Sequence, residues 1–177
     1  IQQGDSLNVF TDTLYYYKDT DIAELVGEVA LNQGSKQLWT KDLTYHLGEQ
    51  YGEYSQGGIL VDNEMQVSSK RGLYYAASEE VVFRDSVVVL HPEFNLAADS
   101  MRYLAALSKV LFTGPTNIYT PEAKIYCESG YYDLKEETAE FNQNAQNERE
   151  KKKATADTIR YMAGAGEILM LGNVHVE

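Results

Sequence analysis

The sequence predicts an all-β protein built from antiparallel strands, and three observations carry that prediction. A tyrosine recurs every 29 residues along the chain. Between these tyrosines, apolar and polar residues alternate as they do in half-buried strands. Turn-forming residues fall about halfway through each period. Self-similarity at a fixed period of roughly 20 to 50 residues is typical of repeat proteins. We therefore expect about six two-strand repeats of 29 residues.

The period is visible in several columns of the sequence, not in one residue type alone. The repeating tyrosines are Tyr16, Tyr45, Tyr74, Tyr103, Tyr132 and Tyr161. The position seven residues before each of them is apolar, and the position nine residues after is large and mainly apolar. The spacing is kept without an insertion. The whole chain, 1–177, is therefore predicted to be a single repeat domain.

Each unit is predicted to form two strands. Apolar residues or glycine occupy alternate positions from Ala23 to Leu31, a period of two that is typical of a half-buried strand. The alternation slips by one residue near Asp12 and Thr13, which indicates a β-bulge or bend. Short turns favour antiparallel neighbours, so we expect eleven or twelve strands in a long meander. The meander must roll or fold to bury its apolar face.

Composition excludes several function classes. The formal net charge is −12, which disfavours nucleic acid and anionic membrane surfaces as partners. The longest apolar stretches are strand-sized, too short for a membrane-spanning helix. The chain begins at Ile1, and we expect that processing or truncation removed whatever preceded it.

No residue pattern predicts catalysis or a metal site. The single cysteine, Cys127, permits neither an intrachain disulfide nor a multi-cysteine zinc site. His46, His91 and His175 occupy different columns and have no metal-ligand or catalytic-triad spacing. We therefore expect a protein that is not an enzyme, with no catalytic and no metal-ligating residues.

Two charged or polar features depart from the apolar pattern. The stretch from Asn142 to Lys153 is almost wholly polar, and we expect a solvated or mobile hairpin there. Arg102 and Arg160 are equivalent by repeat. They are interpreted first as a ladder of outward charges, with contact to an anionic ligand as the alternative.

The apolar columns predict an inside surface that runs along the array. The repeating tyrosines are interpreted as a register-fixing aromatic column, with a ligand groove as the alternative. The phenylalanine column is the better candidate for a continuous apolar interior, although a core packed by its own side chains fits equally well. The candidate interior positions are Val9, Leu25, Val29, Leu38, Val67, Phe83, Val87, Leu96, Phe112, Ile125, Phe141 and Met170.

These residues resemble a known family. Apolar residues or glycine alternate over residues 23–31, Gln33-Gly34 follows, and residues 38–45 continue with Leu-x-Thr-x-x-Leu-x-Tyr. The last unit contains Gly172-Asn173-Val174. The pattern is similar to the repeating signature of the OstA-like, or LptA-type, periplasmic lipopolysaccharide-transport proteins. The resemblance covers essentially the whole chain.

The resemblance implies both a fold and a function. The fold would be an antiparallel β-jellyroll, an open-ended trough with an apolar interior. Family members carry lipopolysaccharide between inner and outer membrane in the Gram-negative periplasm, with no cofactor. The twelve interior positions would then contact acyl chains. The partners would be lipopolysaccharide or a related lipid, and other bridge proteins or copies of this chain added end to end.

Two hypotheses of different classes therefore stand. In the first, the trough shields lipid acyl chains during transport. Burying about a dozen methylenes is worth on the order of 10 kcal/mol, which exceeds the repulsion between an acidic surface and lipid phosphates. In the second, the trough is filled by its own side chains, and the protein is a structural module that assembles through exposed edge strands.

Overall fold

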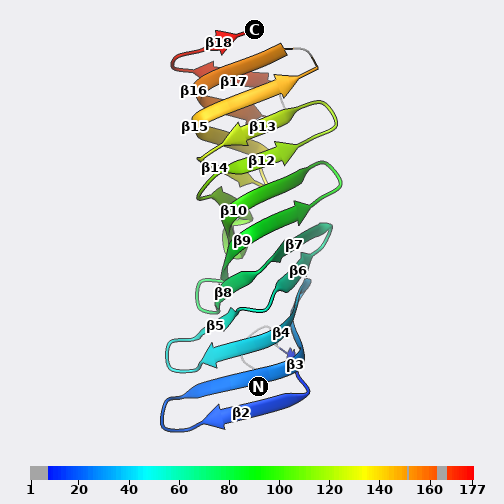
Figure 1. Ribbon diagram of the computed structural model, residues 1–177, viewed down its shortest axis with the longest axis vertical. Coiled ribbons are helices and arrows are strands. Elements are labelled where there is room, and N and C mark those ends of the chain that lie inside the picture. Colours follow the sequence, from blue (N-terminus) through cyan, green and yellow to red (C-terminus); the bar gives the residue numbers. More distant parts are fainter. Residues whose placement is uncertain (1–7, 151, 163–166) are drawn as a thin grey trace.

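The computed structural model describes residues 8–150, 152–162 and 167–177, which fold into one antiparallel sheet of eighteen strands and a single 3-10 turn, η1 (Ala105–Leu107). The strands are stacked along one axis, with β2 at one end and β18 at the other (Figure 1). Six strands are long: β3 (Ile22–Gln33), β4 (Lys36–His46), β9 (Glu80–Leu90), β10 (Asn95–Leu104), β15 (Thr138–Arg149) and β16 (Lys152–Met162). The other twelve are β1 (Asn8–Phe10), β2 (Thr13–Tyr17), β5 (Tyr51–Tyr54), β6 (Gly58–Asp62), β7 (Met65–Ser69), β8 (Arg71–Tyr75), β11 (Lys109–Phe112), β12 (Thr116–Tyr119), β13 (Lys124–Cys127), β14 (Ser129–Asp133), β17 (Glu167–Leu171) and β18 (His175–Val176).

The sheet is folded along its length into two layers, the β-jellyroll that was expected. One half of each long strand pairs with strands of layer A, in the order β2-β3-β4-β5-β8-β9-β10-β11-β14-β15-β16-β17. The other half pairs in layer B, in the order β1-β3-β4-β6-β7-β9-β10-β12-β13-β15-β16-β18. The short strands are therefore halves of long strands broken at the fold. Counted as such, the described chain has twelve long strands, which agrees with the predicted eleven or twelve.

The break between the layers is made by bends in every strand. The predicted bend near Asp12 and Thr13 is confirmed, since β1 ends at Phe10 and β2 begins at Thr13. Opposite it, the β3 ladder shifts register between Val26 and Val29. Gly27 has a φ of +106°, and a Cβ there would collide with the Asp12 side chain. The bend therefore requires glycine at this position.

Two rows of inward side chains run across the strands and face each other between the layers. The layer B row follows the paired residues Val9, Leu31, Leu38, Leu60, Val67, Val89, Leu96, Ile118, Ile125, Asn147, Ala154 and Val176. The layer A row includes Leu14, Leu25, Leu43, Tyr54, Gly72, Phe83, Met101, Phe112, Gly130, Phe141, Ile159 and Met170. Most members are buried in one continuous core. Burial of this apolar surface is the main stabilising term.

In the N-terminal half the core is filled by its own side chains. Phe83 is fully buried, and the ring of Tyr54 lies so close to Gly58 and Gly72 that a Cβ at either position would collide with it. The Tyr54 hydroxyl is also buried, in a 2.7 Å hydrogen bond with Ser69 Oγ. Close packing therefore leaves little room between the layers here.

The seam, which we define as the side where the hairpin turns of the two layers meet, is closed by polar contacts in this half. Tyr74 Oη donates to Gln33 Oε1 (2.7 Å), and Tyr103 Oη donates to Asp62 Oδ2 (2.9 Å). Each of these hydrogen bonds joins residues 41 positions apart. Ser35 Oγ also donates to Asp62 Oδ1 (2.7 Å). The carboxylate of Asp62 is therefore well satisfied although it is buried.

The expected hairpin from Asn142 to Lys153 is present, formed by β15 and β16 with an exposed tip, but the stretch does not leave the sheet. β15 continues to Arg149 and pairs on one side with β13 and on the other with β16. Ala145 and Asn147 are buried. The polar composition misled because most of these side chains point outward, while the backbone is held by ladders on both sides. A turn does occur at Glu150, and Lys151 lies outside the described residues.

We expect Tyr103→Phe to destabilise the protein by about 1.5–3 kcal/mol, since the substitution removes a buried hydrogen bond to a charged group. Tyr132→Phe is the matched control: the residue belongs to the same column, but no described residue hydrogen-bonds its hydroxyl. Its effect should stay within about 0.5 kcal/mol. Urea unfolding of both variants measures the difference, and equal losses would show that the seam contact does not stabilise the fold.

Stability should fall as the pH rises above the ordinary tyrosine pKa of 10.0. Burial raises the pKa of Tyr54 to about 12, and burial likewise raises the pKa of Tyr74 to about 12. Both groups bind a proton more tightly in the folded state, so their stabilising contribution is complete below pH 10 and is lost above it. Denaturation midpoints measured between pH 8 and pH 11.5 should show this loss, and a flat profile would contradict it.

Candidate functional site

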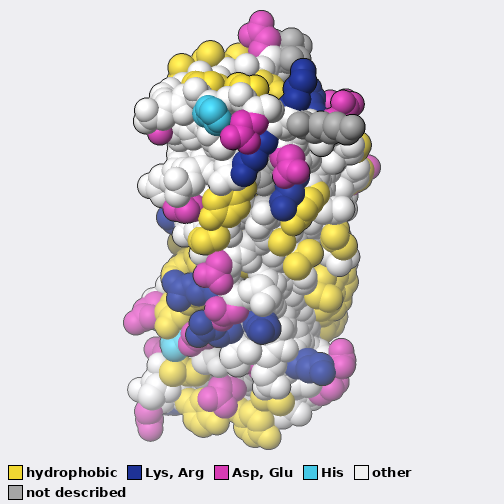
Figure 2. Space-filling model, turned by 45° about the horizontal axis from the view of Figure 1, so that its top comes forward, with side chains coloured by type: hydrophobic (Ala, Val, Ile, Leu, Met, Phe, Trp, Pro, Cys, Tyr) yellow, Lys and Arg dark blue, Asp and Glu magenta, His cyan; other side chains and the backbone are white. Residues whose placement is uncertain are grey.

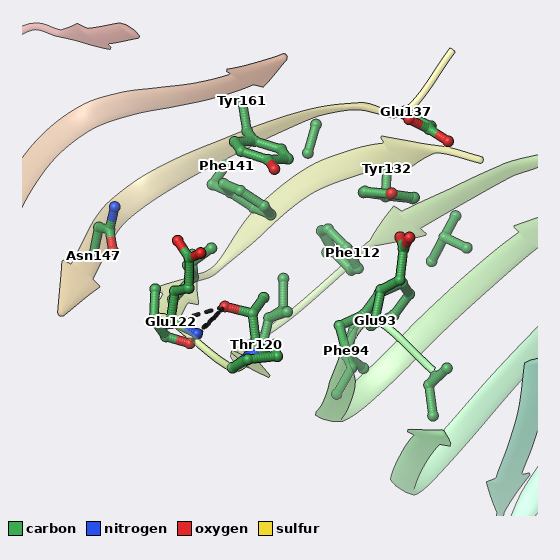
Figure 3. Close-up of a pocket in the computed structure, with 18 of the residues that line it drawn as sticks. Glu93, Phe94, Phe112, Thr120, Glu122, Tyr132, Glu137, Phe141, Asn147 and Tyr161 are labelled. Atoms are coloured by element: carbon green, nitrogen blue, oxygen red, sulfur yellow. Dashed lines mark hydrogen bonds between the residues drawn. The ribbon is translucent and has the colours of Figure 1, made fainter. Parts of the chain in front are cut away.

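A cavity of about 340 Å³ lies between the layers in the C-terminal half of the array. Side chains from β7 to β17 line it, together with the turns at residues 91–94 and 120–123 (Figure 3). This volume is at the lower end of the range found for small-molecule sites, roughly 300–1,000 Å³. The cavity is several times larger than the apolar void of about 40 Å³ beside Tyr74 in the N-terminal half.

The inner wall of the cavity is apolar and aromatic. Leu96 and Ile118 contribute from layer B, and Phe112 and Phe141 from layer A. The rings of Phe112 and Phe141 stack with their centroids 6.1 Å apart. Such a surface can hold hydrocarbon but offers no group for acid–base or nucleophilic chemistry.

The mouth of the cavity is polar and mostly acidic. Glu93, Glu122 and Glu137 stand at its rim, and Arg149 forms an ion pair with Glu122. The turn that carries Glu122 is fixed locally, because the backbone N–H groups of Glu122 and Ala123 donate to Thr120 Oγ1 at 3.3 and 3.0 Å (Figure 3). The rim therefore has a defined shape next to an apolar interior.

The cavity lies where the seam hydrogen bonds described above are no longer found. The 41-residue offset that joins Tyr103 to Asp62 would join Tyr132 to His91, but no described residue hydrogen-bonds the Tyr132 hydroxyl. Instead, Phe94 stacks on His91 (4.8 Å between centroids) and lies against the Tyr132 ring (5.4 Å). In the N-terminal half, which we call the closed half because polar contacts close its seam, the corresponding void beside Tyr74 measures only about 40 Å³.

The twelve candidate interior residues all belong to the core, but only some meet the cavity. Nine of them are buried, and Val9, Ile125 and Met170 are partly buried and pack against the core. Four line the cavity: Leu96, Phe112, Ile125 and Phe141. Leu38 borders the small void of the closed half. The remaining seven do not line the cavity and pack in or against the core: Val9, Leu25, Val29, Val67, Phe83, Val87 and Met170.

Sequence reasoning missed the residues of the mouth. Phe94 and Glu122 sit in turns, where the repeat pattern has no fixed residue type. Tyr132 and Tyr161 line the cavity, which was the alternative interpretation of the tyrosine column. Tyr74 and Tyr103 close the seam, so one column serves two purposes.

Arg102, Arg160 and Cys127, which the sequence also drew attention to, do not line the cavity. Arg102 and Arg160 pair with Glu80 and Glu140 on neighbouring strands, at 2.6 and 2.7 Å, as an outward ladder of charges. Burial raises the pKa of the Cys127 thiol to about 12, so the thiol stays protonated at neutral pH. The described ranges contain no cluster of three or more metal-binding side chains, and no helix within them is long and apolar enough to cross a membrane.

Comparisons with known proteins agree with this architecture. A family model described as "OstA-like protein" matches residues 1–99. A second model, described as "LptA/(LptD N-terminal domain) LPS transport protein", matches residues 66–177. No match was found among curated proteins.

One solved structure supports the fold directly. The crystal structure of LptH from Pseudomonas aeruginosa, described as the LptA-homologous periplasmic component of the lipopolysaccharide transport device, matches with a TM-score of 0.51 and 15% sequence identity. The match covers 56% of this chain and 76% of LptH. The two family models together span the chain from its first residue to its last, and the chain belongs to the OstA-like family of lipopolysaccharide-transport proteins.

Proposed function

We propose that the protein is a periplasmic component of lipopolysaccharide transport that shields lipid acyl chains between its two layers on the way from inner to outer membrane. The observation that carries the proposal is the apolar cavity of about 340 Å³ beneath an open seam. The family and the LptH-like fold support the transport role. The chemistry requires shielding only and no cofactor.

The energetics favour acyl chains over the head group inside the cavity. Each buried methylene contributes about 0.8 kcal/mol, and the wall offers aromatic and aliphatic contacts. Glu93 and Glu137 at the rim repel lipid phosphates, so the head group would stay in solvent. The polar rim and the apolar interior therefore orient an amphipathic ligand.

The closed half sets a limit on where the lipid can lie. The contacts of Tyr74 and Tyr103 hold the seam shut, and Tyr54 fills the space between the layers. The rival hypothesis of a self-packed core therefore describes the N-terminal half, whereas the C-terminal half is open. We propose that the C-terminal half receives the acyl chains in the isolated protein.

The ends of the array support end-to-end assembly. Leu14 on β2 is 56% exposed, whereas its repeat equivalent Leu43 is 3% exposed. Figure 2 shows hydrophobic side chains gathered at both ends of the molecule. At the other end, Ile168, Leu171 and Val176 are exposed. Among described residues, β2 pairs only with β3, so its outer edge is free to add a strand. We propose that bridge proteins of the same fold, or copies of this chain, bind there.

Photocrosslinking tests the shielding of acyl chains. A photoreactive side chain at Phe112, on the cavity wall, should give lipopolysaccharide adducts. The matched control is Leu111, the next residue of β11, which points to the opposite face of the sheet. Phe83 in the closed half should label weakly. Equal labelling from positions 111 and 112 would refute shielding between the layers.

Charge substitution tests the assembly surface. Leu14→Lys combined with Tyr16→Lys should weaken association by at least tenfold, because lysines on an edge strand oppose strand addition. Val88→Lys is the control, since Val88 is similarly exposed but lies in the middle of the array. Sedimentation velocity over a concentration series measures the change. An unchanged association constant would place the contact elsewhere.

A further inference from the structure

One residue breaks the apolar row of layer B. The positions equivalent to residue 147 in the other units are all aliphatic: Leu31, Leu60, Val89, Ile118 and Val176. Only the fifth of the six 29-residue repeats has a polar side chain at this position, Asn147. The ladder places it between Ile125 and Ala154, so both of its cross-strand neighbours are apolar.

The Asn147 amide is buried and lines the cavity. The residue is 7% exposed, and its Oδ1 is the one buried side-chain oxygen or nitrogen without a hydrogen-bond partner among the described residues. Figure 3 shows the amide on β15 at the cavity, on the same strand as Phe141. Asn147 is therefore part of the wall of the cavity of about 340 Å³.

An amide in this position is unfavourable for folding alone. A buried carbonyl without a donor keeps its full desolvation penalty, whereas an aliphatic side chain would complete the row. Of the charged side chains that line the site, Arg149 is already paired with Glu122. Oδ1 therefore receives no hydrogen bond from the described residues, so a donor brought into the cavity could satisfy it.

We propose that Asn147 is a hydrogen-bonding site inside the cavity and that the cavity selects acyl chains bearing a hydroxyl group. A hydroxyl can donate to Oδ1 and accept from Nδ2 of the same amide. The group must be uncharged, because the row around Asn147 holds no opposite charge to compensate a buried ion. This inference rests on the proposed acyl-binding function and deepens it by naming the ligand class.

Competition binding tests the inference with two uncharged probes. These are the methyl ester of a long-chain 3-hydroxy fatty acid and the ester of the unsubstituted acid of equal length, each displacing a fluorescent apolar dye. The natural protein should prefer the hydroxylated ester by about three- to tenfold, the size of one net hydrogen bond. Asn147→Leu should abolish that preference while raising the urea midpoint of the unliganded protein.

Ile118→Val is the matched control, because Ile118 lines the same cavity at the equivalent position of the preceding unit. It should weaken both esters equally and keep their ratio. A ratio near one in the natural protein, or a ratio unchanged by Asn147→Leu, would overturn the role of Asn147 and leave acyl binding intact. Failure of both esters to displace the dye would overturn acyl binding itself, and the inference with it.

Discussion

The structure depends on keeping two inward rows of side chains in register across twelve long strands. Side chains of a strand alternate between its faces, so a slip of one residue would turn a whole row toward solvent. The repeat avoids this by placing each bend at the same point of the period. The bends at Asp12 and Gly27 show how it is done: the glycine turns the strand and the aspartate side chain covers it, with Glu28 N–H donating to the carboxylate at 3.3 Å. The two layers can then face each other along the entire array.

The contacts at the seam differ between the two halves of the array, although both halves share the same two-layer arrangement. Tyrosines of one column stand along layer A, and what they meet depends on the residue 41 positions earlier. Gln33 and Asp62 accept hydrogen bonds from Tyr74 and Tyr103, and the layers close. At the next step His91 stacks on Phe94 instead, and Phe94 lies against Tyr132. An aromatic contact keeps the Tyr132 ring at the wall without drawing the layers together through a hydrogen bond. The residue 41 positions before each tyrosine thus differs between the half with a packed core and the half with a cavity.

The two rows of inward side chains could be predicted from the sequence because their residues repeat every 29 positions. The contacts at the seam could not be predicted, because their residues do not follow that repeat. The 29-residue columns and the period-two alternation predicted the strands and the twelve interior candidates, of which nine are buried, and the slip in the alternation predicted the bend near Asp12. The turn residues Phe94 and Glu122 follow no column, and pairing across 41 residues is invisible to a period of 29. The polar stretch after Asn142 was misjudged for a related reason. The polar side chains of this stretch belong to the exposed face of β15, whereas Ala145 and Asn147 on the other face are buried. One column holds the informative exception, because Asn147 stands where the other units have aliphatic residues.

The two halves are linked by the physics of repeat arrays, in which each unit is stabilised by its neighbours. A cavity lacks the contacts that a filled core supplies, so a unit that opens must draw stability from units that do not. Phe83 and Met101, both fully buried, lie directly before Phe112 in the layer A row. These buried side chains therefore support Phe112 in the cavity wall from the neighbouring strands. An open seam beside a well-packed one is a stable way to hold an apolar surface ready for a ligand in water, and the unpaired amide of Asn147 is tolerated because the fold does not depend on that unit alone.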